Sequence, residues 1–301
     1  MSKLSIWIKE FRLPFLLVTV SAVLIGLATA WGMHHVFNFF YAVLTLVGAS
    51  CLHLSVNVLN DYFDYKSGID LKTTPTPFSG GSGILPMKLL EPTSVYRAGL
   101  LFLAVGSIIG VYFTIMRGWP VLILLLIGAI SIYFYSQKIS SWGIGEVFVG
   151  LNFGPLMVLG TYYVQTQMIA WEPLYVGLIP GILTAAVLYI NEFPDLVADI
   201  AGGRYHIPAR LGKERAVNGY TVLMFTGYTL IILGVAVRMM PIPCLSALAS
   251  LPIAVKGIRI AREHYDRIAE LIPAMASTIM ANAITGFLLT VGYLIHGIFT
   301  I

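Results

Sequence analysis

The sequence has few charged residues and almost no cysteine. Only 11% of its 301 residues are Asp, Glu, Lys or Arg, whereas 58% are hydrophobic and the mean hydropathy is +0.86. So few charges do not cover the surface of a water-soluble protein of this size, in which roughly 25% of residues are charged. Cys51 and Cys244 both lie inside apolar stretches, which argues against a disulfide framework and against a cysteine metal site. The composition therefore predicts a chain whose main solvent is lipid.

The net charge of +4 does not indicate a nucleic-acid partner. The 18 Lys and Arg residues are spread among long apolar runs and form no coherent basic face. Nothing in the sequence indicates an obligate protein partner. We therefore expect the partners to be the lipid bilayer and small molecules dissolved in it or bound at its surface.

Long apolar runs are the main feature of the chain. A membrane-spanning helix needs about 20 largely apolar residues. Runs of this kind lie near residues 14–32, 38–59, 93–115, 119–137, 144–166, 172–193, 217–239, 241–260 and 272–299. They predict an all-α, multi-pass membrane protein with about nine transmembrane helices, in which residues 1–301 form a single domain.

The distribution of Lys and Arg predicts the orientation, because cytoplasmic loops carry an excess of both residues. With a cytoplasmic N-terminus, all but Arg117 and Arg238 lie on the cytoplasmic side. The two long loops, near 60–92 and 194–216, then face the cytoplasm as well. We expect a protein of the cell membrane with its N-terminus and site inside and its C-terminus outside.

The first of these loops follows a polar stripe on an otherwise apolar helix. At 100° per residue, four side chains fall on one helix face: His53, Asn57, Asn60 and Asp64. Gly68 is expected to end this helix, so that Asp70 folds back toward Asp64.

A second stripe, formed by Asn191, Asp195 and Asp199, precedes the other long loop, and Pro194 is expected to kink or end that helix. Asn60 and Asp64 recur at a constant offset as Asn191 and Asp195. This recurrence predicts a parallel repeat of two four-helix units plus one further helix. Asp61 and Glu192 point off the two stripes and are interpreted as caps of helix ends.

Carboxylates near hydrocarbon need compensation, because each costs on the order of 2.5–3.5 kcal/mol on insertion scales. A divalent cation supplies it. A set of Asp and Asn oxygens, without Cys and with at most one His, suits Mg²⁺ rather than zinc. Two facing acidic motifs therefore predict a pair of Mg²⁺ ions that hold a diphosphate between them.

At these residues the sequence resembles the UbiA superfamily of intramembrane prenyltransferases. The segments Asn60-Asp61-Tyr-Phe-Asp64 and Asp195-Leu-Val-Ala-Asp199 match the two motifs of that superfamily, N-D-x-x-D and D-x-x-x-D. The commonest version has a third Asp four residues after the second, where this chain has Gly68, and supplies Asp70 instead. This variant resembles the branch that makes menaquinone and vitamin K₂.

The resemblance implies Mg²⁺-dependent transfer of a polyprenyl group from polyprenyl diphosphate to a membrane-associated aromatic quinone precursor such as 1,4-dihydroxy-2-naphthoate, as in menaquinone biosynthesis. It assigns the metal ligands as Asn60, Asp64, Asp70, Asn191, Asp195 and Asp199. The catalytic residues would be Asp64, Asp195, Lys138 and Tyr135. Diphosphate binding would fall to Lys66, Lys72, Lys138, Arg204, Arg210 and His53, although a packed, hydrogen-bonded role for His53 fits equally well.

Two other functions remain open at this point. One is prenyl transfer to a glycerol-phosphate lipid, as in archaeal ether-lipid synthesis. The other, from a different class, is a cation-coupled membrane transporter, although a carrier should place its carboxylates near mid-membrane.

The segment Lys72 to Pro92 is either an ordinary flexible loop or a lid over the diphosphate, and we favour the lid because it follows the first acidic motif directly.

Overall fold

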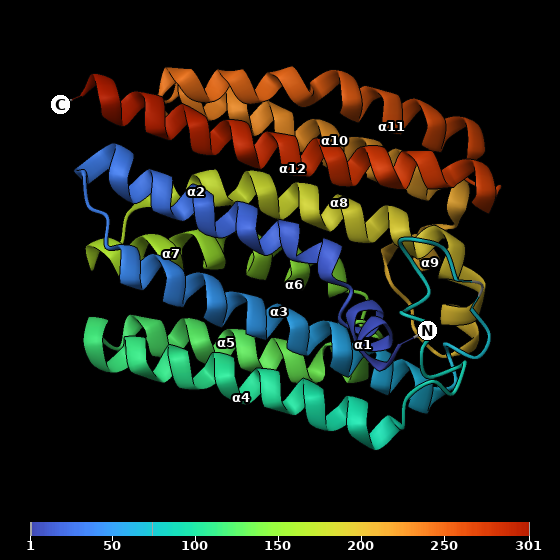
Figure 1. Cartoon of the computed structure of the whole chain (residues 1–301). Helices are drawn as coiled ribbons and strands as arrows, with labels where there is room; N and C mark the ends of the chain where they lie inside the picture. Colours follow the sequence, from blue (N-terminus) through green and yellow to red (C-terminus); the bar gives the residue numbers. More distant parts are fainter. Residues whose placement is uncertain (1, 74, 301) are drawn as a thin grey trace.

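The structure is a computed structural model that describes residues 2–73 and 75–300, and every side chain among them except that of Ser136. All regular elements within these residues are helices (Figure 1), so the prediction of an all-α chain is confirmed. In chain order they are α1 (Lys3–Phe11), η1 (Leu13–Phe15), α2 (Leu16–His34), α3 (Phe39–Ser67), α4 (Pro92–Arg117), α5 (Pro120–Phe134), η2 (Tyr135–Ile139), α6 (Gly145–Leu151), η3 (Asn152–Leu156), α7 (Met157–Thr166), α8 (Trp171–Ala201), α9 (Ile207–Leu211), α10 (Lys213–Ala236), η4 (Ile242–Ser250), α11 (Leu251–His264) and α12 (Ile268–Phe299).

Eight helical stretches in the described part of the chain are long and apolar enough to cross a membrane. Each contains or largely overlaps one of the predicted runs. The remaining run, 119–137, corresponds to the shorter apolar helix α5, which η2 extends to Ile139. The two termini lie at opposite ends of the bundle in Figure 1, which an odd number of crossings requires. The count of nine and the division into two four-helix units stay predictions.

The chain bends sharply between α1 and the first long helix. Arg12 has a left-handed backbone (φ +52°) and Pro14 follows two residues later, so α1 cannot continue straight into α2. In Figure 1, α1 is seen end-on while the long helices run across the view. The short helix therefore crosses one end of the bundle.

Helix α8 lies at the centre of the bundle, where it contacts α6, η3, α10 and α12. Its contact with η3 is very close, because a Cβ atom added to Gly154 would meet the Gly177 carbonyl oxygen at 2.5 Å. Small residues of this kind let two membrane helices pack backbone against backbone. Pro194 does not end α8, which continues to Ala201. Of the two outcomes expected of Pro194, a kink or an end, the end was wrong: the missing N–H removes only one hydrogen bond from a long helix whose preceding residues are buried.

Gly68 does end α3, as predicted, with a left-handed backbone (φ +79°). The C-terminal ends of α3 and α8 lie at the same end of the bundle, together with α1, α9 and the loop that follows Gly68 (Figure 1). The fold thus brings the two acidic motifs, the two long loops and the N-terminal helix to one end.

Candidate active site

The two acidic motifs face each other across one arginine. The Arg204 guanidinium donates hydrogen bonds to both carboxylate oxygens of Asp64, one of them at 3.1 Å, and to Asp199 Oδ1 at 3.4 Å. Burial by itself lowers the pKa of Arg204, but the contacts with Asp64 and Asp199 outweigh this effect and raise it above its ordinary value. Arg204 therefore stays charged and ties the end of α3 to the end of α8.

The glycine-rich part of the loop after α3, residues 79–83, folds over these acids. The Gly80 N–H donates to Asp195 Oδ2 at 3.0 Å, and the Ser82 N–H donates to Asp61 Oδ2 at 2.8 Å. Gly81, between them, has a left-handed backbone (φ +68°), and a Cβ atom there would lie 3.1 Å from Asp70 Oδ2. Only glycine lets the backbone approach the carboxylates this closely. The loop is therefore in place over the motif, which fits the lid interpretation.

The acidic cluster fits a divalent cation. Burial, with the charges of Asp64 and Asp61, raises the pKa of Asp70 to about 9. The buried oxygens Asp195 Oδ1 and Asn191 Oδ1 have no hydrogen-bond partner within the described residues. Unpartnered, oxygen-only donors beside uncompensated negative charge are the ligands that Mg²⁺ prefers.

A polar cavity holds most of the predicted site. It is lined by the predicted metal ligands and by His53, Tyr135 and Arg204: Asn60, Asp64, Asp70, Asn191, Asp195 and Asp199. Its remaining walls combine apolar side chains with polar ones, which include Arg12, Asn57 and Glu192. The structure thus brings together nine of the predicted residues, whose roles remain predictions.

The other predicted basic residues lie elsewhere. Lys66, Lys72, Lys138 and Arg210 are exposed and line neither this cavity nor the apolar one described below. The Arg210 guanidinium donates to the carbonyl oxygens of Tyr205 and Trp142, at 2.8 and 2.7 Å. These contacts hold a loop in place, and the diphosphate-binding roles of all four stay predictions.

His53 has the packed, hydrogen-bonded environment that was one of its two predicted roles, and diphosphate binding stays a prediction. Its Nδ1 lies 2.7 Å from Thr19 Oγ1, its ring packs edge-on against Phe153 with the ring centroids 4.5 Å apart, and it also lines the polar cavity. It is a packed, hydrogen-bonded residue at the cavity wall.

Asp61 and Glu192 do not cap helix ends, contrary to the prediction. Asp61 is buried within α3 and accepts the hydrogen bond from Ser82, and Glu192 is buried within α8. Both helices continue beyond their motifs, so these two acids face neighbouring segments instead of the water beyond a helix terminus.

Two residues near the N-terminus belong to this region but were not predicted. Glu10, fully buried, accepts a hydrogen bond from Ser82 Oγ at 2.7 Å. Arg12 lines the polar cavity, with Asp61 4.0 Å away and the Phe15 ring beneath its guanidinium. Within the described residues the Arg12 side chain makes no hydrogen bond. One sequence signal could have identified them: Glu10 and Arg12 directly precede Leu13-Pro14, and this proline separates two helices.

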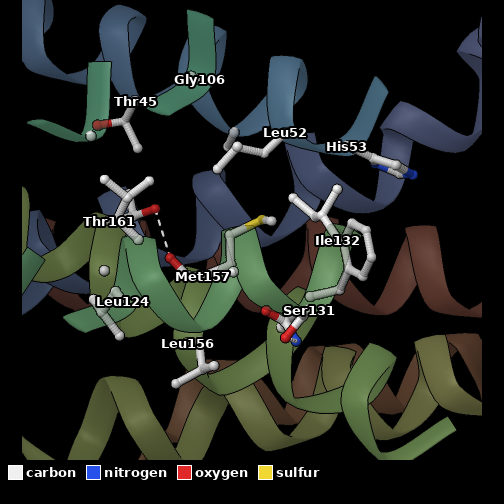
Figure 2. Close-up of a pocket in the computed structure, with 18 of the residues that line it drawn as sticks. Thr45, Leu52, His53, Gly106, Leu124, Ser131, Ile132, Leu156, Met157 and Thr161 are labelled. Carbon is white, nitrogen blue, oxygen red and sulfur yellow. Dashed lines mark hydrogen bonds between the residues drawn. The ribbon is translucent and has the colours of Figure 1, made fainter. Parts of the chain in front are cut away.

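A second, apolar cavity adjoins the polar one. It lies among α3, α4, α5 and α7, and Figure 2 shows Leu52, Ile132 and Met157 pointing into it. The hydroxyl of Thr161 donates to the Met157 carbonyl oxygen of its own helix, so it presents no unpaired donor to the cavity, whose lining is mostly apolar. The same residues line both cavities where they meet: His53, Val56, Tyr135, Val149 and Phe153.

One end of this combined space is acidic and the other is apolar, a shape suited to an amphipathic ligand with an anionic head. Residues 19–282 match the UbiA prenyltransferase family. The chain belongs to this family. It is therefore a membrane-embedded prenyltransferase, in agreement with the resemblance of its motifs and with the helical fold.

Individual relatives agree with the family. The 2-carboxy-1,4-naphthoquinone phytyltransferase of Synechocystis is 25% identical over 295 residues, which are 96% of this chain and 92% of the relative. The 1,4-dihydroxy-2-naphthoate octaprenyltransferase of Mycobacterium leprae is 30% identical over 267 residues, 86% of each chain.

Solved UbiA homologues share the fold. That of Aeropyrum pernix superposes with a TM-score of 0.71 at 14% identity, over 92% of this chain and 98% of the other. That of Archaeoglobus fulgidus bound to GPP and Mg²⁺ superposes with a TM-score of 0.63 at 15% identity, over 95% and 99%.

Proposed function

We propose that this UbiA-family chain transfers a polyprenyl group from its diphosphate to an aromatic quinone precursor of the dihydroxynaphthoate class, with Mg²⁺ bound between the two acidic motifs. The observation that carries the proposal is the pair of joined cavities. An acidic end is suited to metal and diphosphate, and the apolar end is suited to a prenyl chain. The two relatives, a 2-carboxy-1,4-naphthoquinone phytyltransferase and a 1,4-dihydroxy-2-naphthoate octaprenyltransferase, support this class of acceptor.

Asn60, Asp64, Asp70, Asn191, Asp195 and Asp199 would hold the metal. Bound there, Mg²⁺ supplies positive charge that makes diphosphate a better leaving group. Arg204 and Arg12 add positive charge from the protein, and Arg12 has all its N–H donors free of hydrogen bonds within the described residues. The Archaeoglobus homologue bound to GPP and Mg²⁺ supports this donor and this ion.

The junction of the two cavities is where the allylic carbon–oxygen bond would break. Tyr135, Phe153 and His53 line it, and the faces of aromatic rings stabilise positive charge that develops beside them. The electron pair of the broken bond leaves with diphosphate. The aromatic ring of the acceptor then bonds to the allylic carbon, and its ring carbon loses a proton.

Water must stay out of this junction, because it would convert the allylic cation to an alcohol. Residues 79–83 cover the acidic end from the loop side, through the hydrogen bonds of Gly80 and Ser82. We propose that this loop is a lid that opens to admit diphosphate and closes before bond cleavage.

A glycerol-phosphate acceptor is the alternative within the same chemistry. The carrier hypothesis loses its support, because the chain belongs to an enzyme family and its acidic motifs lie at one end of the bundle. We further propose that this end and the N-terminus face the cytoplasm and the C-terminus the outside of the cell membrane, as the Lys and Arg distribution predicts.

The test uses the full chain purified in detergent with geranylgeranyl diphosphate and Mg²⁺. Dihydroxynaphthoate and geranylgeranylglyceryl phosphate are offered in separate reactions, each with and without EDTA, and products are identified by mass spectrometry. The Asp64→Asn protein, purified in the same way, controls for contaminating activity.

We expect a prenylated naphthalene that EDTA and Asp64→Asn both abolish. Product on the glycerol lipid alone would overturn the acceptor but keep the mechanism. Product that persists in EDTA would overturn the metal assignment.

A further inference from the structure

A second cluster of ionisable side chains lies beside the polar cavity, which one of its members, Glu192, also lines. Glu146 lies in the first turn of α6, Glu192 lies within α8, and His206 is the N-cap residue of α9. Their exposed fractions are 2%, 9% and 1%. One ligand atom from each, two carboxylate oxygens and an imidazole nitrogen, lie within 4.8 Å of one another. Three elements thus converge on one buried point.

The carboxylates of this cluster are not satisfied by the protein. Glu146 Oε1 accepts the Ile207 N–H at 2.8 Å, but Glu146 Oε2 and Glu192 Oε2 accept no hydrogen bond within the described residues. Arg204, the basic residue of the neighbouring site, is already bound to Asp64 and Asp199. Apart from the His206 ring, 3.6 Å from Glu192 Oε2, no basic side chain pairs with either acid within the described residues, and two buried carboxylates with so little compensating charge are strongly unfavourable.

We propose that Glu146, Glu192 and His206 bind one divalent transition-metal ion of the zinc class. A dication with two carboxylates and a neutral imidazole gives a site of zero net charge, which removes the cost of burying the two acids. An imidazole ligand favours zinc-class ions over Mg²⁺, and zinc sites commonly combine His with Glu. The site adjoins the Mg²⁺ motifs, since Glu192 also lines the polar cavity and His206 lies against Asp199, but Glu146 and His206 do not line that cavity.

The two nitrogens of His206 face different partners. Nδ1 lies 3.6 Å from Glu192 Oε2 and accepts the Ala209 N–H at 3.2 Å, while Nε2 lies 3.3 Å from Asp199 Oδ2. Binding through Nδ1 exchanges the long contact with Ala209 for the ion. Nε2 then carries the ring proton toward Asp199, an arrangement in which a carboxylate orients a metal-bound histidine. The ion thereby joins α6, α8 and α9 and holds Asp199 of the second motif in place.

The experiment measures zinc on the full chain in detergent. Protein stripped with EDTA is incubated with equimolar Zn²⁺ in millimolar Mg²⁺, which occupies oxygen-only sites, and the retained metal is counted by mass spectrometry after gel filtration. Glu146→Gln keeps an acceptor for Ile207, and His206→Asn keeps a good N-cap for α9. Asp195→Asn is the matched control, since it alters an acid of the Mg²⁺ motif and leaves the cluster intact.

We expect one zinc per chain in the wild type and in Asp195→Asn. Glu146→Gln and His206→Asn should weaken zinc affinity by more than ~100-fold, the upper end of the effect of losing a mere supporting partner. No retained zinc in the wild type, zinc unaffected by both substitutions, or zinc lost in Asp195→Asn would each overturn the proposal.

If the variants do not fold, the zinc X-ray absorption spectrum of the wild type decides, because the site requires one imidazole ligand and an oxygen-only shell refutes it. None of these readouts uses prenyl transfer, so this proposal and the proposed function fail separately.

Discussion

Gly81 is the position at which the contact between the loop and the acids is most directly tested. Its φ is +68°, and a Cβ atom would lie 3.1 Å from Asp70 Oδ2 and 3.2 Å from Asp61 Oδ1. Gly81→Ala therefore has two unfavourable effects. It places an alanine in the left-handed region, and its Cβ atom pushes the backbone away from the carboxylates of Asp61 and Asp70. Gly83→Ala is the matched control, because φ there is +72° and the added Cβ meets only the flexible end of Met87.

The magnitudes separate the two variants. A left-handed backbone costs about 1–2 kcal/mol for a residue with a Cβ, and both variants incur it. Displacement at Gly81 also breaks the Ser82 N–H hydrogen bond to Asp61 or the Gly80 N–H hydrogen bond to Asp195. A hydrogen bond to a charged group contributes about 1.5–3 kcal/mol. The loop of Gly81→Ala should therefore open about 10- to 160-fold more readily than that of Gly83→Ala.

Amide hydrogen exchange of peptides covering residues 76–88 measures this opening, in detergent with EDTA so that no metal competes for the acids. Prenyl transfer measured with Mg²⁺ should fall further in Gly81→Ala than in Gly83→Ala. Equal exchange rates in the two variants would refute the reasoning, because the contact with the carboxylates would then contribute nothing to holding the loop.

Three further predictions test the rest of the site. Asp195→Asn should abolish turnover without changing the thermal unfolding temperature, whereas the exposed Asp266→Asn should leave turnover intact; full activity in both would remove Asp195 from the metal site. Arg204→Gln leaves Asp64 without its cation, so it should destabilise the protein in EDTA by about 3–5 kcal/mol. Mg²⁺ should restore part of this stability in a thermal unfolding assay. A loss of stability that Mg²⁺ does not change would contradict a metal bound at Asp64. Gly128 lines the apolar cavity, and a Cβ atom added there would have no atom within 4 Å. Gly128→Leu should therefore raise the KM for long prenyl donors more than the KM for short ones. An equal rise for both would argue against a prenyl chain in this cavity.

The helices and the motif-bearing ends were predictable from the sequence because their signals are local. Long apolar runs need no knowledge of their neighbours, and Gly68 ends α3 as its backbone freedom predicts. The spacing of Asn60 and Asp64, repeated at Asn191 and Asp195, was enough to predict that the two stripes face one cavity.

The features that escaped prediction depend on tertiary contacts. Arg12 was counted only as a topology signal, because its approach to the cavity depends on the bend between α1 and α2. Asp61 was interpreted as a cap because the sequence does not reveal that Ser82 returns to it from the loop. Glu146 and His206 lie far apart in the chain and on different short helices, so no spacing rule connects them with Glu192.

The joined cavities also determine whether the rate depends on the concentration of donor in the membrane or on its concentration in the buffer. A donor whose chain occupies an apolar space among α3, α4, α5 and α7 comes from the bilayer, and a longer apolar product returns to it. For such an enzyme, saturation depends on the mole fraction of donor in the membrane and not on its amount per volume of buffer. Adding inert lipid or detergent at a constant total amount of donor should therefore lower the rate by surface dilution. A KM expressed in molar units would change with every preparation, whereas a KM expressed as donor per lipid molecule would not.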